Sequence, residues 1–402
     1  MHRSSLTNIE RIDRPLHSNP VERDPQIFSP ADLRSSLNPE RTQGMADFYF
    51  SPRQAELQGL GLSSYETHLL SRLVQILQLG VFMSQKRKDT ADSLDHTHHG
   101  ATQCEAYVKS AFSSEMLSDK LFPLRLTGAS MQFIIQHLPV PANASKLSVT
   151  NIFQLCIWRT FAFGNSEYLQ EITIKEDKKP DLLKLCYIIQ QWGNGPLKLS
   201  VPAYGQLQII KAKIPTMLSM FWDLSHEISS THKPKTTPPT FAALHERLLS
   251  KKISSIPRHG LIAWLLTSDF FEYGFCQTPT IQDIANHMTN SGASGPKGAM
   301  KIVSEETGQP APENAEELAK VLGTVFELLQ NPPQRSLTIK NVVTECKVIQ
   351  GRELSVVDLE HALCKISRQN SRANAGKSKG SAVKGTSRAV RKSNEKEDAL
   401  EN

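Results

Sequence analysis

Apolar residues recur at helical spacing through most of residues 63–368, and this periodicity constrains the fold more than any other feature of the chain. Ser63 and Glu66 have the Ser-x-x-Glu spacing of a capping box, which satisfies backbone N–H groups at a helix start. An apolar stripe containing Leu69, Leu73 and Ile76 follows, so we expect a helix there. The same spacing predicts helices over about 129–138, 149–162, 181–191, 206–228, 241–251, 258–274, 280–289, 297–304, 314–330, 337–348 and 355–368.

Strand patterns are confined to two short stretches. Residues 171–175 and 197–201 alternate between apolar and polar side chains, as a half-buried strand does. A nucleotide-binding parallel sheet requires strands that alternate with helices, and the sequence has no such rhythm. We therefore predict a mostly α fold.

Composition divides the chain into five parts. Residues 1–45 are rich in Pro, Ser and Arg without a periodic apolar pattern, which predicts a disordered N-terminal arm. A Pro/Thr-rich connector at 231–240 separates two expected helical lobes, an N-terminal lobe at 46–230 and a C-terminal lobe at 241–368. A weaker break runs from Gly308 to Asn314. Residues 369–402 offer almost nothing to bury, so we predict a disordered C-terminal tail.

The net charge of the chain points mildly to an anionic partner. A formal charge of +6 on 402 residues does not by itself establish nucleic-acid binding. Residues 369–402 contain eight Lys and Arg against four Asp and Glu, so the predicted tail holds +4 of this charge. The expected folded part is therefore nearly balanced.

The cysteines and the apolar runs indicate an intracellular protein that does not cross a membrane. The six cysteines have no close pair, which is typical of reduced, packed thiols: Cys104, Cys156, Cys186, Cys276, Cys346 and Cys364. The first residues lack the apolar run of a secretory signal. The richest apolar run, 69–83, is interrupted by Arg72, Gln75 and Gln78, so no membrane span is expected.

Motifs that carry catalysis or nucleotide binding are missing from the sequence. The Gly-rich stretch 292–298 lacks the Gly-Lys-Ser/Thr ending of a phosphate-binding loop. The chain has no Gly-x-Ser-x-Gly elbow, no His-Glu-x-x-His and no Cys-x-x-Cys. We therefore expect a non-enzymatic protein without a cofactor. A site assembled from distant residues is the alternative that motifs leave open.

One cluster has residue types that could bind zinc. His96, His98 and His99 follow Asp95 and precede Cys104. Structural zinc sites usually combine ligands from two separate turns, whereas these residues share one polar stretch. A solvated loop is the favoured interpretation, and we predict no bound metal.

Basic residues of the expected folded part occur in short groups, several at helix ends, where a side chain can reach a phosphate while the helix packs through its other face. The groups that we nominate are Lys211 and Lys213, then Lys251, Lys252 and Arg258, then Lys297 and Lys301. Taken singly, each is better explained as a solvated face. Together they would suit a groove that follows a phosphate backbone. The four tryptophans lie in apolar helical contexts, which indicates core packing over base stacking: Trp158, Trp192, Trp222 and Trp264.

Residues 258–303 resemble the central region of nucleoproteins from nonsegmented negative-strand RNA viruses. Leu-Leu-Thr-Ser-Asp-Phe at 265–270 and Ile-Gln-Asp-Ile-Ala at 281–285 are similar to bornavirus nucleoproteins. The small-residue turn before the amphipathic stretch at 296–303 is similar to filovirus nucleoproteins. The likeness covers about 45 of 402 residues, and a fungal mymonavirus nucleoprotein would fit a chain of this length.

The resemblance implies a specific function. In this family two helical lobes clamp single-stranded RNA in a basic groove, and arms from the chain ends bind neighbouring subunits. The chain is then expected to encapsidate viral genomic RNA without sequence preference, to assemble with itself, and to act with the viral polymerase and its cofactor. It would be found in the virion and in the host cytoplasm, or in the nucleus.

Lys297 and Lys301, on the matching segment, become the first candidates for RNA contacts. Lys211, Lys213, Lys251, Lys252 and Arg258 are second candidates, chosen by charge alone. The family arrangement also places the lobe boundary near Gly308 rather than at 231–240, and both boundaries stay open.

A second interpretation belongs to another class of protein. The helical lobes could form a cellular scaffold whose basic tail contacts chromatin or a membrane. A nucleoprotein purified from a heterologous host should carry host RNA, whereas a scaffold should be free of it.

Overall fold

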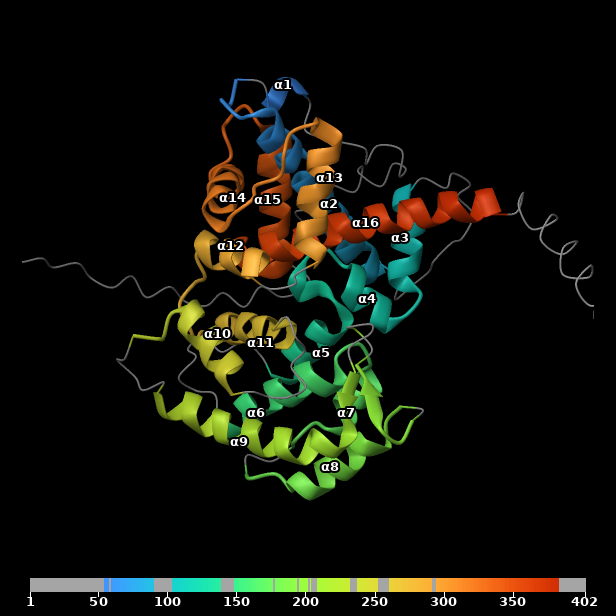
Figure 1. The fold of residues 1–402 in the computed structure, drawn as a ribbon, viewed down its shortest axis with the longest axis vertical. Coiled ribbons are helices and arrows are strands. Elements are labelled where there is room, and N and C mark those ends of the chain that lie inside the picture. Colours follow the sequence, from blue (N-terminus) through green and yellow to red (C-terminus); the bar gives the residue numbers. More distant parts are fainter. Residues whose placement is uncertain are drawn as a thin grey trace, which may run out of the picture. The chain divides into compact units, whose positions relative to one another are not determined.

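The computed structural model describes residues 54–57, 59–89, 103–138, 148–175, 178–193, 195–201, 203, 208–231, 237–251, 260–290 and 294–382. These residues are mostly helical, which confirms the predicted fold class (Figure 1). The predicted arm at 1–45 and the histidines of 95–99 lie outside the described residues. No helix of this described part combines the length and the apolar character needed to cross a bilayer.

The described residues before position 192 form ten helical elements. They are α1 (Gln54–Leu57), α2 (Ser64–Asp89), α3 (Gln103–Phe112), α4 (Glu115–Leu121), the 3-10 turn η3 (Arg125–Thr127), α5 (Ala129–His137), α6 (Val149–Ile157), the π-helix η5 (Trp158–Ala162), α7 (Ser166–Glu171) and α8 (Leu182–Gln191).

An antiparallel hairpin separates these helices from the second half of the fold. Its strands are β1 (Lys198–Ser200) and β2 (Gln208–Ile210), with Lys198 opposite Ile210. The 3-10 turn η7 (Lys211–Lys213) follows directly. The remaining helices are α9 (Ile214–Thr231), α10 (Phe241–Ser250), α11 (Leu261–Glu272), α12 (Ile281–Asn290), α13 (Ser294–Thr307), α14 (Ala315–Gln330), α15 (Leu337–Gln350) and α16 (Val356–Ala382).

Several helices begin at side chains that bind the free N–H groups of the first turn. Ser63 Oγ accepts a hydrogen bond from the Glu66 N–H at 3.2 Å, and Glu66 Oε2 accepts one from the Ser63 N–H at 2.9 Å. The predicted capping box is therefore confirmed. Ser355 and Asp358 repeat the arrangement at the start of α16, where the Ser355 N–H donates to Asp358 Oδ2 at 2.7 Å.

The strand predicted at 171–175 is wrong. α7 occupies Ser166–Glu171, and the residues that follow it pair with a side chain instead of a second strand. Gln154 Nε2 donates to the Ile172 carbonyl at 3.1 Å, and Gln154 Oε1 accepts from the Ile174 N–H at 2.6 Å. One glutamine of α6 thus replaces the strand partner that the alternating pattern would require.

Two other predicted boundaries are also wrong. Residues 208–210 pair with β1 as β2, so the helix predicted from 206 begins only at Ile214. α16 continues to Ala382, so residues 369–382 are helical and are not the predicted disordered tail. Extending a helix that is already anchored costs far less than starting one, which explains the continuation into a polar sequence. Residues 383–402 lie outside the described part.

The packing of the helices does not follow the predicted boundary at 231–240. α2 belongs to the predicted N-terminal lobe, yet it packs against α13, α14, α15 and α16. α11 belongs to the predicted C-terminal lobe, yet it packs against α6 and η5. The described residues all belong to one compact unit, and the division into two lobes stays a prediction.

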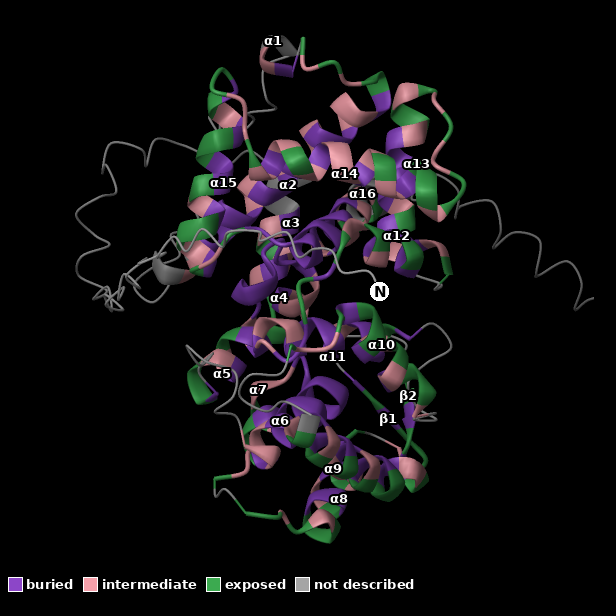
Figure 2. Ribbon diagram, turned by 90° about the vertical axis from the view of Figure 1, so that its left-hand side faces the viewer, coloured by how far each residue is buried: buried purple, intermediate pink, exposed green. Residues whose placement is uncertain are grey.

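Buried side chains run through the interior of this unit (Figure 2). Trp158, Trp192 and Trp264 are buried and Trp222 is partly buried against the same core, so the predicted core role of the tryptophans is confirmed. Five free cysteines have described side chains, and four of them are buried: Cys156, Cys186, Cys276 and Cys346, with Cys364 half-buried.

Candidate functional site

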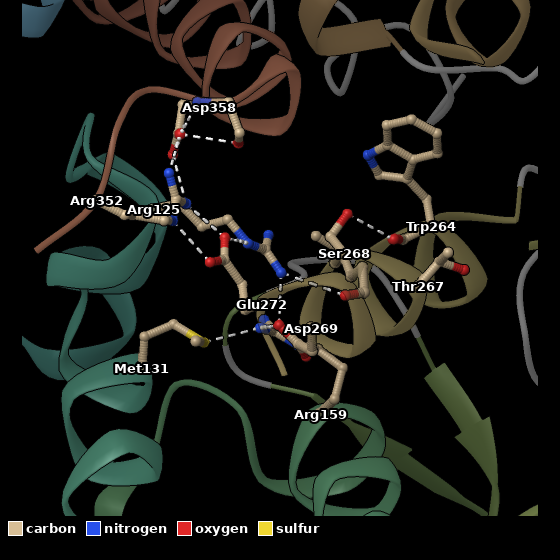
Figure 3. Close-up of polar contacts among 12 residues, drawn as sticks. Arg125, Met131, Arg159, Trp264, Thr267, Ser268, Asp269, Glu272, Arg352 and Asp358 are labelled. Carbon is tan, nitrogen blue, oxygen red and sulfur yellow. Dashed lines mark hydrogen bonds and ion pairs between the residues drawn. The ribbon is translucent and has the colours of Figure 1, made fainter. Parts of the chain in front are cut away.

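Asp269 of α11 lies between two buried arginines (Figure 3). Arg125 Nη2 donates to Asp269 Oδ1 at 2.5 Å, and Arg159 Nε donates to Asp269 Oδ2 at 2.5 Å. All three side chains are at most 3% exposed. Arg125 comes from η3 and Arg159 from the π-helix η5, so this one carboxylate connects three elements that are distant in sequence.

The ion pairs continue from Asp269 to the start of α16. Arg352 Nη2 lies 2.5 Å from Glu272 Oε1, and Arg352 Nη1 lies 2.5 Å from Asp358 Oδ2. Burial acts to lower the pKa of Arg352, but the charges and hydrogen bonds of Asp358 and Glu272 outweigh it and raise that pKa. Burial raises the pKa of Glu272 against the opposing charge of Arg352. Three arginines and three carboxylates thus form a neutral network, in which Arg352 is half-buried and the other five are buried: Arg125, Arg159, Arg352, Asp269, Glu272 and Asp358.

A cavity of about 120 Å³ lies beside this network. Its wall combines cationic side chains with aromatic rings and two carboxylic acids. The residues that matter here are Asp119, Phe122, Arg125, Arg159, Phe163, Trp264, Glu360, His361, Lys365 and Arg368. The Arg159 guanidinium lies 3.7 Å from the centre of the Phe163 ring, which is cation–π geometry.

At the edge of this cavity, side chains on one face of α16 bind backbone carbonyls at the end of α4. Lys365 Nζ donates to the Lys120 carbonyl at 2.7 Å, and Arg368 Nη1 donates to the same oxygen. The His361 ring nitrogen Nε2 lies 3.1 Å from the Phe122 carbonyl. His361, Lys365 and Arg368 share a helix face because their spacing is i, i+4 and i+7. These groups satisfy carbonyls that the last turn of α4 leaves free, and the negative end of the helix dipole favours the cations.

The ionisable groups of the cavity wall have shifted pKa values. Burial raises the pKa of Asp119 to about 6, although hydrogen bonds from Ser130 oppose the shift. Burial also raises the pKa of Glu360 and lowers that of Lys365 well below its usual range. Guanidinium groups stay protonated in proteins. The arginines are therefore the permanent charges of this wall.

Arg368 differs from the other arginines of the cavity. It is exposed, and its donor group bonds a neutral carbonyl. Among the described residues it forms no ion pair, whereas Arg125 and Arg159 share Asp269. The rim of the cavity therefore carries an exposed cation beside a wall that contains aromatic rings. An anionic group and an adjoining flat ring are the chemistry that such a wall can accommodate.

The structure places the predicted contact residues on three elements. Lys211 is buried in η7, and its Nζ donates to the Gln190 carbonyl at 2.6 Å. Its nomination as an exposed phosphate contact is therefore wrong, because the ammonium group caps the end of α8. Lys213 is half-buried on the same turn. Lys251 Nζ lies 2.7 Å from Glu227 Oε2, so a carboxylate already neutralises its charge. Lys252 and Arg258 lie outside the described residues.

Lys297 and Lys301 are both exposed on α13. Lys297 Nζ donates to the Thr289 carbonyl in the last turn of α12 at 3.2 Å. Lys301 Nζ lies 3.6 Å from Glu305 Oε1, and both of these side chains are more than half exposed. A solvent-screened pair of this kind contributes little to stability, so both lysines can contact a ligand at small cost.

α13 connects these lysines to the cavity through its packing on α16. A Cβ at Gly295 would lie 2.7 Å from Cys364 Sγ, and a Cβ at Gly298 would lie 2.4 Å from Ser367 Oγ. The two glycines therefore let α13 approach α16 more closely than larger residues could. Their role is helix packing, and Lys297 lies between them in the sequence.

Sequence patterns did not indicate these cavity residues, because the residues come from five separate elements. Arg125 and Arg159 are single charges within apolar segments, and a lone charge there signals a buried ion pair. The spacing of His361, Lys365 and Arg368 also marks one basic helix face. Among the described residues no group of His, Cys, Asp and Glu could hold a metal ion.

No family model, characterised protein or solved structure matches the chain.

Proposed function

We propose that the chain coats single-stranded RNA as a non-enzymatic, self-assembling nucleoprotein. The observation that carries the proposal is the exposed cation of Arg368 at the rim of a cavity lined by arginines and aromatic rings. Guanidinium groups bind phosphate oxygens, and aromatic rings stack on bases of any sequence. A coat must bind every part of a genome, so contacts of this general kind suit it.

The exposed lysines of α13 extend this candidate surface. α13 packs against α16, and Gly298 of α13 meets Ser367, the neighbour of Arg368. Lys297 and Lys301 are thus one helix away from the cavity rim. In this proposal they contact successive phosphates of the strand whose neighbouring nucleotide enters the cavity. Assembly with further copies would continue the same path along the RNA.

The first test is whether the full chain, purified from a heterologous host, carries RNA. We expect a raised ratio of absorbance at 260 to 280 nm, and a reduced particle mass by light scattering after nuclease treatment. A monomer free of nucleic acid that binds no added RNA would overturn the proposal. That result would favour the alternative, a helical interaction protein.

The second test compares two exposed arginines that both donate to a backbone carbonyl. Arg368 bonds the Lys120 carbonyl at the cavity, and Arg335, in the segment between α14 and α15, bonds the Gly59 carbonyl. R368A should weaken binding to unrelated RNA oligonucleotides about tenfold or more, because a hydrogen bond to a charged group contributes about 1.5–3 kcal/mol. R335A should leave fluorescence anisotropy titrations unchanged. Equal losses in both variants would show that the cavity is not the binding site.

A further inference from the structure

Three ring side chains from consecutive helices meet at one mostly buried point. Trp264 of α11 stacks on His287 of α12, with the ring centres 3.9 Å apart and the planes inclined by 8°. His245 of α10 lies edge-on to both rings, and its ring centre is 5.5 Å from that of Trp264 and 5.9 Å from that of His287. We call these three residues the histidine latch, because they join α10, α11 and α12.

Water has little access to the two imidazoles of the histidine latch. His287 is buried, and so is the Trp264 ring that stacks on it. His245 is half-buried, but its Nε2 atom is buried and has no hydrogen-bond partner among the described residues. The backbone of Gly260 lies close to this atom, since a Cβ there would be 4.0 Å from it. Protonation makes both ring nitrogens donors, so a charged His245 would carry a buried N–H group without a described acceptor.

The charged groups that act on the imidazoles come from α12 and α13. Asp283, near the start of α12, favours protonation of His245. Lys297 of α13 bonds a carbonyl in the last turn of α12, and its charge opposes protonation of His287. Each imidazole also opposes protonation of the other, because two cations 5.9 Å apart repel each other. The face of Trp264 would attract a charged His287, but this contact does not replace the hydration that burial removes.

The carboxylates of α11 and α16 have other partners. Asp269 and Glu272 of α11 belong to the arginine network described above. Glu360 of α16 interacts with Trp264, and burial raises its pKa, which favours the uncharged acid. None of these three acids is among the charges that shift the pKa of either imidazole.

α10 is the least anchored of the three helices. Its main described packing partner is α11, whereas α12 also packs on α14 and α16 (Figure 1). Arg247 and Lys251 of α10 pair with Glu227 of α9, and these side chains are roughly one third exposed, so the pairs contribute little. The Gln277 N–H donates to the Pro239 carbonyl at 2.9 Å and holds the start of α10. α10 can therefore separate from α11 about this end.

Burial lowers the pKa of both imidazoles. The pKa of His245 falls from 6.5 to about 4, and that of His287 falls to about 3, where the charges of His245 and Lys297 add to burial. An imidazole that reaches solvent regains its ordinary pKa of about 6.5. The closed state is fully favoured above pH 7, and opening becomes more favourable as pH falls from about 6 to about 4, because the open state then binds more protons.

We propose that the histidine latch is an acid-sensitive switch that holds α10 against α11 and α12 at neutral pH and releases α10 in acid. Each opening takes up two protons, one on each imidazole. Trp264 also lines the cavity, so the switch makes the shape of that wall depend on pH. The inference does not depend on RNA binding, because it concerns the packing of these helices alone.

Hydrogen exchange of the full chain, followed by mass spectrometry, tests the switch directly. Between about pH 5.5 and 4.5 the opening constant of α10 should rise about 100-fold per pH unit, because two protons enter and each contributes a factor of about ten. Peptides from α15, which packs against α2 and α14, should not show this dependence.

Replacing the titrating rings should remove the pH dependence. H245F and H287F should each reduce the rise to about tenfold per pH unit, and H245F/H287F should make the opening of α10 nearly independent of pH. Phe keeps a flat ring at each position without a proton to bind. H245Q/H287Q is a second non-titrating pair with the same expectation, and thermal melts at pH 7 show that the fold is retained.

The matched control is another histidine that contacts a tryptophan. His226 of α9 lies edge-on to Trp222 with ring centres 5.0 Å apart, but its side chain is exposed. H226F should leave the pH dependence of α10 unchanged, because an exposed imidazole binds a proton equally well in the open and closed states.

Three results would overturn the proposal. An opening constant of α10 that does not change with pH would show that the imidazoles are not linked to opening. The same rise in wild type and in both non-titrating pairs would assign the protons to other groups. Equal acid-dependent opening of α10 and α15 would show that the whole unit unfolds together, with no local switch.

Discussion

At the scale of single residues, the buried ion pairs hold distant segments of the chain together. Asp269 accepts hydrogen bonds from Arg125 and Arg159, and the three side chains exclude solvent almost completely. Charges buried in this way are tolerated only when each has a partner, because the interior of a protein solvates ions poorly. Residue 269 therefore cannot change without affecting both arginines.

Replacing Asp269 with Asn should be strongly destabilising. The amide removes the negative charge and leaves two guanidinium charges buried with less compensation, which costs about 3–5 kcal/mol. The matched control is E306Q, because Glu306 pairs with Arg72 at about 30% exposure and should lose at most about 1 kcal/mol. Urea unfolding of the two variants compares the free energies directly. Similar small losses would mean that the buried network contributes no more than a surface pair.

Asp119 gives the chain a stability that depends on pH. Burial raises its pKa from 3.8 to about 6 in the folded chain. Between these pH values the folded state binds more protons than the unfolded state, so the contribution of Asp119 to stability decreases as pH rises from about 4 to 6. Urea unfolding at several pH values gives the free energy of unfolding of the wild type and of D119N. We expect the difference, wild type minus D119N, to fall through this window and to be flat above pH 7. A difference that rises with pH would show that the folded carboxylate is stabilised as an anion.

At the scale of elements, the contact between α13 and α16 connects the candidate RNA surface to the core. Gly295 and Gly298 are one turn apart on α13, and both face α16. Their lack of side chains decides how closely the helices approach. This glycine-rich stretch lacks the ending of a phosphate-binding loop, and Gly295 and Gly298 serve helix packing instead.

Replacing Gly298 with Ala should destabilise the chain. The new methyl group would lie 2.4 Å from Ser367 Oγ and 3.2 Å from Ser367 Cβ, and overpacking of this kind costs about 1–3 kcal/mol. G323A is the control on α14, where a Cβ would meet no atom within 4 Å. It should stabilise the chain by about 0.5–1 kcal/mol, because Ala favours a helix more than Gly does. Opposite shifts in thermal midpoint confirm the packing role, and stabilisation by both variants would contradict it.

At the scale of the whole molecule, the described helices bring one predicted pair of lysines near the cavity and leave the other groups elsewhere. Lys297 and Lys301 lie on α13, which packs against α16. Lys211 serves the end of α8, and Lys251 pairs with Glu227 of α9. RNA binding that is independent of base sequence should therefore depend on α13 more than on η7 or α10.

The double variant K297Q/K301Q tests this arrangement. Binding to unrelated RNA oligonucleotides should weaken by a similar factor for each, and the slope of log affinity against log salt should become shallower by about 0.7 per lost phosphate contact. K340Q/K347Q on α15 removes two lysines of comparable exposure and should not change the slope. A changed preference among sequences would indicate base recognition by α13.

Local sequence patterns anticipated most of the helices and little of the candidate site. The capping box at Ser63 and the long apolar stripes act within a few residues, so periodicity and caps predicted α2 and most of the later helices. α3, α4 and α7 were not predicted. α4 and α7 have only seven and six residues, and helices of that length depend on partners elsewhere in the chain. The alternating pattern at 171–175 predicted a strand that does not form. The side chain of Gln154, on α6, hydrogen-bonds the Ile172 carbonyl and the Ile174 N–H in place of a partner strand.

The sequence by itself determined the fold class, the capped start of α2 at Ser63 and the core role of the tryptophans, because each depends on spacing within a single segment. Only the tertiary structure decided that Arg125, Arg159 and Asp269 meet, that Lys211 is buried, and that α2 packs against the last four helices. These contacts join residues more than twenty positions apart. Their partners are chosen by burial and charge compensation across the whole unit, which no local pattern of residues records.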